Sequence, residues 1–205
     1  MKKFTFVSMI VFVLFMVACG SEPQRSAGNS STPAASQNPF GQTYNTPCEM
    51  YDDDDWFADT GIAMGSYKQK GTVQQNALTN AQDLCRAKVK HAYKGMISNF
   101  AQTHGNNNGS DIINKVSRAG DQIIDAVIND TQAKCKAWGS VDSDGMIEAY
   151  VGIKIRKREL SEKIAQEVKN VLTEDEKTRI DFKEDEYRKQ MDDRFEKYKE
   201  EKKNN

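Results

Sequence analysis

The sequence predicts an α+β fold, with long helices followed by an antiparallel hairpin and a closing helix. Between residues 73 and 103, apolar residues recur at steps of three or four, which is one face of a helix. Between residues 131 and 156 the apolar residues alternate instead, in two runs separated by an Asp-Gly turn, which is typical of a hairpin. All four prolines lie before residue 48, so no proline interrupts these elements.

The first 18 residues have the composition of a signal peptide. Lys2 and Lys3 precede the apolar run 4–18, which is shorter than the roughly 20 residues that a membrane-spanning helix needs. The run ends in Met16-Val17-Ala18-Cys19, which resembles the lipobox of bacterial lipoproteins, although Met16 stands where leucine is commonest. The alternative is an ordinary secreted protein in which this cysteine occurs by chance.

The lipobox resemblance implies that Cys19 is the lipidation site. In that family the cysteine thiol takes a diacylglycerol and the peptide is cut just before it, and two or three acyl chains together anchor a protein stably. Gly20 follows where lipoproteins kept in the inner membrane often carry Asp. By this sorting rule the resemblance implies the outer membrane, with the periplasmic and surface faces both open.

Residues 19–48 are predicted to form a flexible lipidated tether, because Ser, Asn, Gln, Thr and Pro predominate and cannot form a packed core. We expect a domain over residues 49–172 and a charged helical tail over 173–205. Without Lys2 and Lys3, 27 of the 29 Lys and Arg residues remain against 30 Asp and Glu. This near-neutral balance gives no electrostatic footprint for nucleic acid.

The domain is expected to begin with four adjacent aspartates, Asp52 to Asp55, and then Trp56. Calcium takes oxygen ligands, but contiguous side chains diverge, so a solvated lead-in to an aromatic anchor is the stronger interpretation. A strand is predicted over residues 58–67. Gly61 and Gly65 within it indicate a close approach of another backbone.

The long helix is predicted over residues 73–103, and its apolar face consists of Leu78, Ala81, Cys85, Val89, Ala92, Met96 and Phe100. A break at residues 104–109 precedes a second helix, for which Ser110 is the predicted N-cap. Gly120 weakens this second helix by about 1 kcal/mol relative to Ala.

In the hairpin, the first strand is predicted over residues 131–139, with small apolar residues at Ala133, Cys135 and Ala137. The turn is 142–145, and its Asp-x-Asp-Gly lacks the spacing and closing Glu of a calcium-binding EF-hand loop. The second strand is expected to bury Ile147, Ala149, Val151, Ile153 and Ile155.

A closing amphipathic helix is predicted over residues 159–172. Thr173 and Glu176 then have the capping-box spacing of a new helix, and 22 of the 30 residues from 174 to 203 are charged. A thin stripe runs along this tail: Ile180, Tyr187, Met191, Phe195 and Tyr198. A largely solvated helix is the favoured interpretation, with a partner or self-association seam and disorder as alternatives.

Several spaced residues resemble the LPP-type family of small bacterial outer-membrane lipoproteins, whose module is similar to the N-terminal domain of the flagellar assembly protein T. The matching positions are Trp56, Gly61, Gly65, Ala77, Ala81, Cys85, Ala92 and the run 150–153. The resemblance covers about residues 56–168. It implies a small curved antiparallel sheet packed on the long helix, and it supplies no catalytic residues.

The sequence lacks the usual catalytic and metal-binding signatures. The two histidines, His91 and His104, are not in a Cys/His cluster, and no nucleophile elbow, phosphate-binding glycine loop or zincin motif is present. We therefore predict no catalytic residue, metal or cofactor, and a non-catalytic envelope lipoprotein that binds another envelope protein or itself. The alternative is a carrier of a small apolar ligand between the long helix and the sheet. An enzyme would require a buried carboxylate or histidine with a perturbed pKa, for which burial of His91 beside an acid is the simplest check.

Three cysteines remain beyond Cys19, and they allow one disulfide and one free thiol. Cys85 and Cys135 are both expected to face the helix–sheet interface, so a bond between them is one hypothesis. Two buried free thiols and a pair that involves Cys48 are the alternatives.

Overall fold

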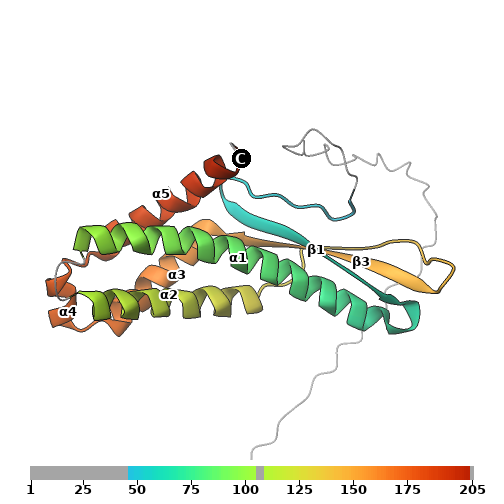
Figure 1. Cartoon of the computed structure of the whole chain (residues 1–205), viewed down its shortest axis with the longest axis horizontal. Coiled ribbons are helices and arrows are strands. Elements are labelled where there is room, and N and C mark those ends of the chain that lie inside the picture. Colours follow the sequence, from blue (N-terminus) through green and yellow to red (C-terminus); the bar gives the residue numbers. More distant parts are fainter. Residues whose placement is uncertain (1–45, 105–108, 204–205) are drawn as a thin grey trace, which may run out of the picture. The chain divides into compact units, whose positions relative to one another are not determined.

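The computed structural model describes residues 46–104 and 109–203, and it has the predicted α+β fold (Figure 1). The predicted signal peptide and most of the predicted tether lie outside the described residues. The elements are β1 (Trp56–Ser66), η1 (Tyr67–Gln69), α1 (Lys70–His104), α2 (Ser110–Asn129), β2 (Cys135–Trp138), β3 (Met146–Arg156), α3 (Lys157–Val171), α4 (Glu174–Arg179) and α5 (Glu184–Lys203).

The three strands form an antiparallel sheet in the order β1-β3-β2. β1 pairs with β3 along its whole length, from Trp56 opposite Arg156 to Ser66 opposite Met146. β2 covers only residues 149–152 of β3, so it is shorter than predicted. The hairpin turn is where the sequence placed it, with Gly145 at φ 73° and the backbone N–H groups of Asp144 and Met146 donating to Asp142.

α1 lies against one face of the sheet, called here the inner face, and contacts both β1 and β3 (Figure 1). The predicted close approach at the glycines is confirmed. A Cβ atom on Gly61 would lie 2.0 Å from the carbonyl oxygen of Ala77, and one on Gly65 would lie 2.7 Å from Val73. The buried face of α1 begins with Val73 and continues with Ala77, while the neighbouring Leu78 is only partly buried.

The C-terminal half of α1 packs with α2 and α5, and α3 packs with α2 and α5 (Figure 1). α2 is continuous through Gly120, and a Cβ atom there would lie 2.1 Å from the hydroxyl of Tyr93. Gly120 therefore makes room for a buried ring, which offsets its low helix propensity. The N-cap of α2 is Gly109, one residue earlier than predicted.

The prediction of a solvated tail is wrong, although its helices and the Thr173–Glu176 capping box are confirmed. Every residue of the stripe is buried in the domain core: Ile180, Tyr187, Met191, Phe195 and Tyr198. The rings of Phe195 and Phe57 pack edge-on with their centroids 5.0 Å apart, and those of Tyr187 and Phe100 pack edge-on with their centroids 5.2 Å apart. The tail therefore completes the core, and the predicted domain boundary at Leu172 falls inside one compact unit.

Candidate functional site: a disulfide-fastened attachment segment

Residues 46–55, called here the attachment segment, connect the predicted tether to β1. Two hydrogen bonds join this segment to Thr60 in β1: the Met50 N–H donates to Thr60 Oγ1 at 2.9 Å, and the Thr60 hydroxyl donates to the Cys48 carbonyl at 2.6 Å. At its other end the Asp53 N–H donates to the carbonyl of Trp56 at 3.0 Å. The segment therefore runs back along β1 in the opposite direction.

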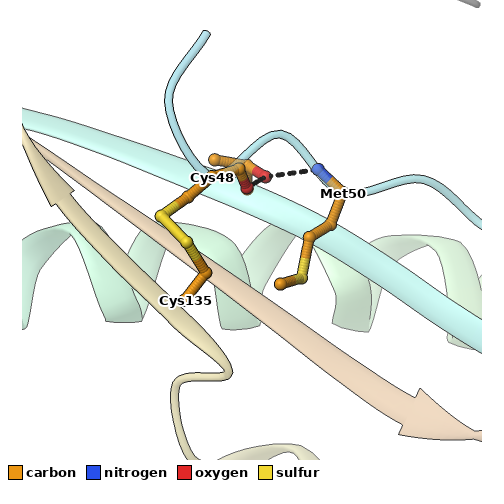
Figure 2. The surroundings of a disulfide bond; sticks show 4 residues. Cys48, Met50 and Cys135 are labelled. Carbon is orange, nitrogen blue, oxygen red and sulfur yellow. Dashed lines mark hydrogen bonds between the residues drawn. A yellow bond between two sulfur atoms is a disulfide. The ribbon is translucent and has the colours of Figure 1, made fainter. Parts of the chain in front are cut away.

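A disulfide fastens this segment to the hairpin. Cys48 is bonded to Cys135 of β2, and their Cα atoms are 5.5 Å apart (Figure 2). Figure 2 also shows, as a dashed line, the hydrogen bond from the backbone nitrogen of Met50 to Thr60 of β1. The segment is thus linked both to β1 and to the opposite edge strand of the sheet.

The hypothesis of a Cys85–Cys135 bond is wrong, and strand alternation explains why. Cys135 pairs with Gly152, whose neighbours Val151 and Ile153 are buried on the inner face. Successive strand residues face opposite sides, so Gly152 and Cys135 face the outer side, away from α1.

Gly152 allows the attachment segment to lie directly on the outer face. A Cβ atom at this position would be 2.8 Å from the sulfur of Met50 and 2.9 Å from the Cys48 carbonyl oxygen. Gly152 also contributes to the hairpin, because its carbonyl accepts a hydrogen bond from the Lys134 N–H, next to β2, at 2.8 Å. A side chain at 152 would displace the segment next to its disulfide.

Cys85 is a free thiol that is completely buried in α1. Burial raises its pKa to about 12, so it stays protonated at neutral pH. The expectation that Cys85 faces the helix–sheet interface is confirmed, and the residue packs there as a small apolar side chain.

Two residues of the aspartate run, Asp52 and Asp53, accept hydrogen bonds from the backbone at the start of β1. Asp52 accepts from the Ala58 N–H at 2.8 Å, and Asp53 accepts from the N–H groups of Asp55 and Trp56 at 3.0 and 2.8 Å. Within the described part of the chain, no three Asp, Glu, His or Cys side chains are grouped so that they could hold a metal ion. The first two aspartates therefore fix the turn into β1.

Lys88 joins the attachment segment to α1. Its ammonium lies 3.1 Å from Asp52 and 2.8 Å from Asp59, and it donates to the Ala58 carbonyl at 2.7 Å. Burial acts to lower the pKa of Lys88, but the carboxylates of Asp52 and Asp59 outweigh burial and raise it. This half-buried cluster also covers the backbone of the edge strand β1 near Ala58, which protects it from pairing with other chains.

The remaining sequence candidates are placed as follows. Cys19 lies outside the described residues. His91 is exposed on α1, with its ring 5.6 Å from that of Tyr198, and His104 lies 4.5 Å from the ring of Phe100. His91 is therefore not a buried histidine. None of the helices in the two described ranges is long and apolar enough to cross a bilayer.

Sequence reasoning missed Gly152 and Lys88, and it kept Cys48 only as an alternative. The sequence does contain a signal for Gly152. The position of the hairpin turn sets the strand register, and this register pairs Gly152 with Cys135. A glycine inside a strand indicates that another backbone approaches closely. No comparable signal pointed to Lys88, whose partners lie about thirty residues away in the chain.

Comparisons of this chain with protein-family models, with curated proteins and with solved structures find no match.

Proposed function

We propose that this chain is a non-catalytic lipoprotein of the bacterial cell envelope, anchored in the outer membrane through Cys19, that binds an envelope protein or itself. The charged and apolar signal sequence and its terminal Met16-Val17-Ala18-Cys19 support export and lipidation. In this proposal the tether leads from the lipid to Cys48. The resemblance to LPP-type lipoproteins is part of this proposal and stays a prediction.

The observation that carries the proposal is the Cys48–Cys135 disulfide. Disulfides persist in oxidising compartments such as the periplasm and the cell surface, and they are rare in the cytosol. The bond lies where the tether reaches the domain, so a pull on the lipid anchor would act on the whole sheet through the disulfide. This placement suits a domain that is held to a membrane by its N-terminus.

A protein-binding role is supported by the uncovered part of β1. The Ile62 carbonyl accepts from Asn80 of α1 at 2.8 Å, but the side chains of Ile62 and Met64 are 45% and 59% exposed. Two exposed apolar side chains on the same face of a strand offer a contact surface for another protein.

The alternative of an apolar-ligand carrier loses its support at the place where it was predicted. The alternative needs space between α1 and the sheet, whereas Gly61 packs against the backbone of Ala77 and Ala81. The helix therefore fills this face of the sheet.

The test of the proposal is Cys19→Ala. We expect the wild-type chain to enter the detergent phase and to carry acyl mass, whereas the variant stays uncleaved or is released without acyl mass. Cys85→Ala is the matched control and should keep both properties. A wild-type chain without acyl mass would refute the anchor.

A further inference from the structure

A groove runs between α2 and α3 on a part of the molecule that the attachment segment does not use. Its volume is about 430 Å³. The α2 side is lined by Ile123, Ala126 and Val127, with Asp130 beyond the end of α2, whereas the α3 side is polar and is lined by Lys163, Gln166, Glu167 and Asn170. Ile123 and Val127 are only partly buried, although both pack against the core. This side of the groove is therefore an accessible strip of apolar surface.

The groove continues into a second hollow of about 360 Å³, because both are lined by Val127, Asp130 and Lys163. The second hollow, called here the cationic mouth, has Trp56 in its wall and four basic side chains around it. These are Lys134, Lys154, Arg156 and Lys163, against the two acids Asp130 and Glu159.

Two of the four basic side chains, Lys134 and Lys163, form no salt bridge within the described part of the chain. Lys154 lies 3.6 Å from Asp53, and Arg156 pairs with Glu159 at 3.2 Å while its guanidinium stacks 5.2 Å from the Trp56 ring. The mouth is thus positive in a chain whose overall charge is slightly negative.

The backbone of β3 adds a donor to this mouth. The carbonyl of Gly152 points toward the β2 side of the sheet and accepts a hydrogen bond from the backbone N–H of Lys134. In an antiparallel strand, the backbone N–H and carbonyl groups of every second residue point to the same side. The Lys154 N–H therefore points the same way, beyond the last residue of β3 that β2 covers. An N–H group beside lysines is a favourable setting for an anion.

We propose that the groove and the cationic mouth together bind an anionic single-chain amphiphile, with its acyl chain along Ile123, Ala126 and Val127 and its charged head among Lys134, Lys154 and Lys163. The groove offers one apolar wall for an acyl chain, opposite a polar wall on α3, and the volumes of the groove and of the mouth lie in the usual range of small-ligand sites. Charge complementarity selects an anionic head over a zwitterionic one. The inference goes beyond the proposed protein-binding role by adding a lipid ligand, and it rests on the proposed membrane anchoring for a nearby source of that lipid.

The binding measurement uses Trp56 as a reporter. The chain has two tryptophans, so Trp138→Phe leaves Trp56 alone in the mouth. All variants are made in the full chain with Cys19→Ala, so that the result does not depend on anchoring, which partitioning tests separately. The probe is lauroyl lysophosphatidylglycerol below its critical micelle concentration, with lauroyl lysophosphatidylcholine and inorganic phosphate as comparison ligands.

We expect saturable change in Trp56 emission with the phosphatidylglycerol probe, at least tenfold weaker binding of the choline probe, and no binding of millimolar phosphate. Equal affinity for both lipids, tight binding of phosphate alone, or no binding of the anionic lipid would each overturn the proposal.

Two pairs of variants locate the site. Lys134→Gln with Lys163→Gln should weaken binding of the anionic probe at least fivefold, whereas the exposed pair Lys68→Gln with Lys94→Gln should not change it. Ala126→Phe should block the groove, and Asn114→Phe, at an exposed position of the same helix, should not. Circular dichroism melts confirm that each variant is folded, and unchanged binding in the groove variants would place the ligand elsewhere.

Discussion

The two halves of α1 are packed in opposite ways. Its N-terminal half presents small buried residues, such as Ala77 and Ala81, to the glycines of β1. Its C-terminal half presents Tyr93, Met96 and Phe100 to the surrounding helices. The sheet half therefore depends on the absence of side chains, and the helical half depends on large side chains that α2 and α5 enclose. The stability of the sheet half should therefore be sensitive to substitutions that add atoms, and that of the helical half to substitutions that remove them.

The largest effect is expected from removing the tail at the helical end. A chain that stops after Leu172 loses the buried stripe from Ile180 to Tyr198. Each such side chain contributes about 1.5–3 kcal/mol, so the loss is roughly 10 kcal/mol, comparable to the whole stability of a typical domain. We expect no cooperative thermal transition by far- and near-UV circular dichroism. A chain that stops after Tyr198 is the control and should melt cooperatively, and a cooperative melt of the shorter chain would show that the stripe is dispensable.

At the sheet end the largest effect is expected from Gly61→Val. The added Cβ would lie 2.0 Å from the Ala77 oxygen and 2.2 Å from the Ala81 nitrogen, and backbone atoms cannot move aside as a flexible side chain can. We expect a loss of at least about 4 kcal/mol in urea unfolding. Gly71→Ala is the matched control, because no atom lies within 4 Å of its added Cβ, and it should be neutral or slightly stabilising. Similar midpoints for both variants would contradict the close helix–sheet packing.

The disulfide should be the next strongest contribution, and it belongs to the sheet end. Its cysteines are 87 residues apart, which corresponds to about 4–5 kcal/mol in the chain-entropy model. We expect Cys48→Ala with Cys135→Ala to lower the free energy of unfolding by up to this amount. The variant should also lose the sensitivity to dithiothreitol that the wild type shows.

Cys85→Ala is the control for this pair, because it removes a thiol without touching the bond. It should keep the full difference between oxidised and reduced protein. If Cys85→Ala abolished that difference, the pairing would be wrong.

The sequence predicted the elements of the fold well, because each has a local signal. The step of three or four in α1, the alternation in β3 and the Asp-Gly turn all depend on residues close in the chain. Gly61 and Gly65 also indicated correctly where another backbone approaches β1. These features needed no knowledge of what packs against them.

The cysteine pairing failed because it depends on which side of β2 is covered. Because the small residues of β2, including Cys135, are apolar, the sequence pattern predicts that they face inward. However, β2 is the edge strand beyond the reach of α1, and its inner face carries the exposed Lys136 and Trp138. The outer face is covered instead by the attachment segment, which residue alternation in β2 alone does not reveal.

The tail was misread for a similar reason. Its charge content predicted a solvated helix, but one narrow stripe is enough to bury a helix when a complementary surface exists. That surface is formed by α1 and α3, whose contacts with α5 are set by tertiary structure. The half-buried ammonium of Lys88 is another case, since its two aspartates come from the attachment segment and from β1.

The smallest effect is expected from Tyr187→Phe, which removes one polar contact from the helical end and leaves its rings in place. The hydroxyls of Tyr93 and Tyr187 are 3.0 Å apart, and the Tyr93 hydroxyl also donates to the Val116 carbonyl at 3.0 Å. Tyr93 therefore keeps a partner in the variant, and the cost at pH 7 should be about 1 kcal/mol.

The pH dependence of this variant gives a second readout. Burial raises the pKa of both tyrosines above the ordinary value of 10, so the unfolded chain releases their protons first as the pH rises. The folded state then binds more protons than the unfolded state, and stability falls with rising pH above about pH 10. Tyr187→Phe removes one of the two groups, so urea unfolding between pH 9 and 11 should show a shallower decline than the wild type. Tyr67→Phe, at a half-exposed position, is the control and should leave the decline unchanged. An equally steep decline in Tyr187→Phe would mean that this hydroxyl is not buried with Tyr93, and the helical end would then be more open than its packing indicates.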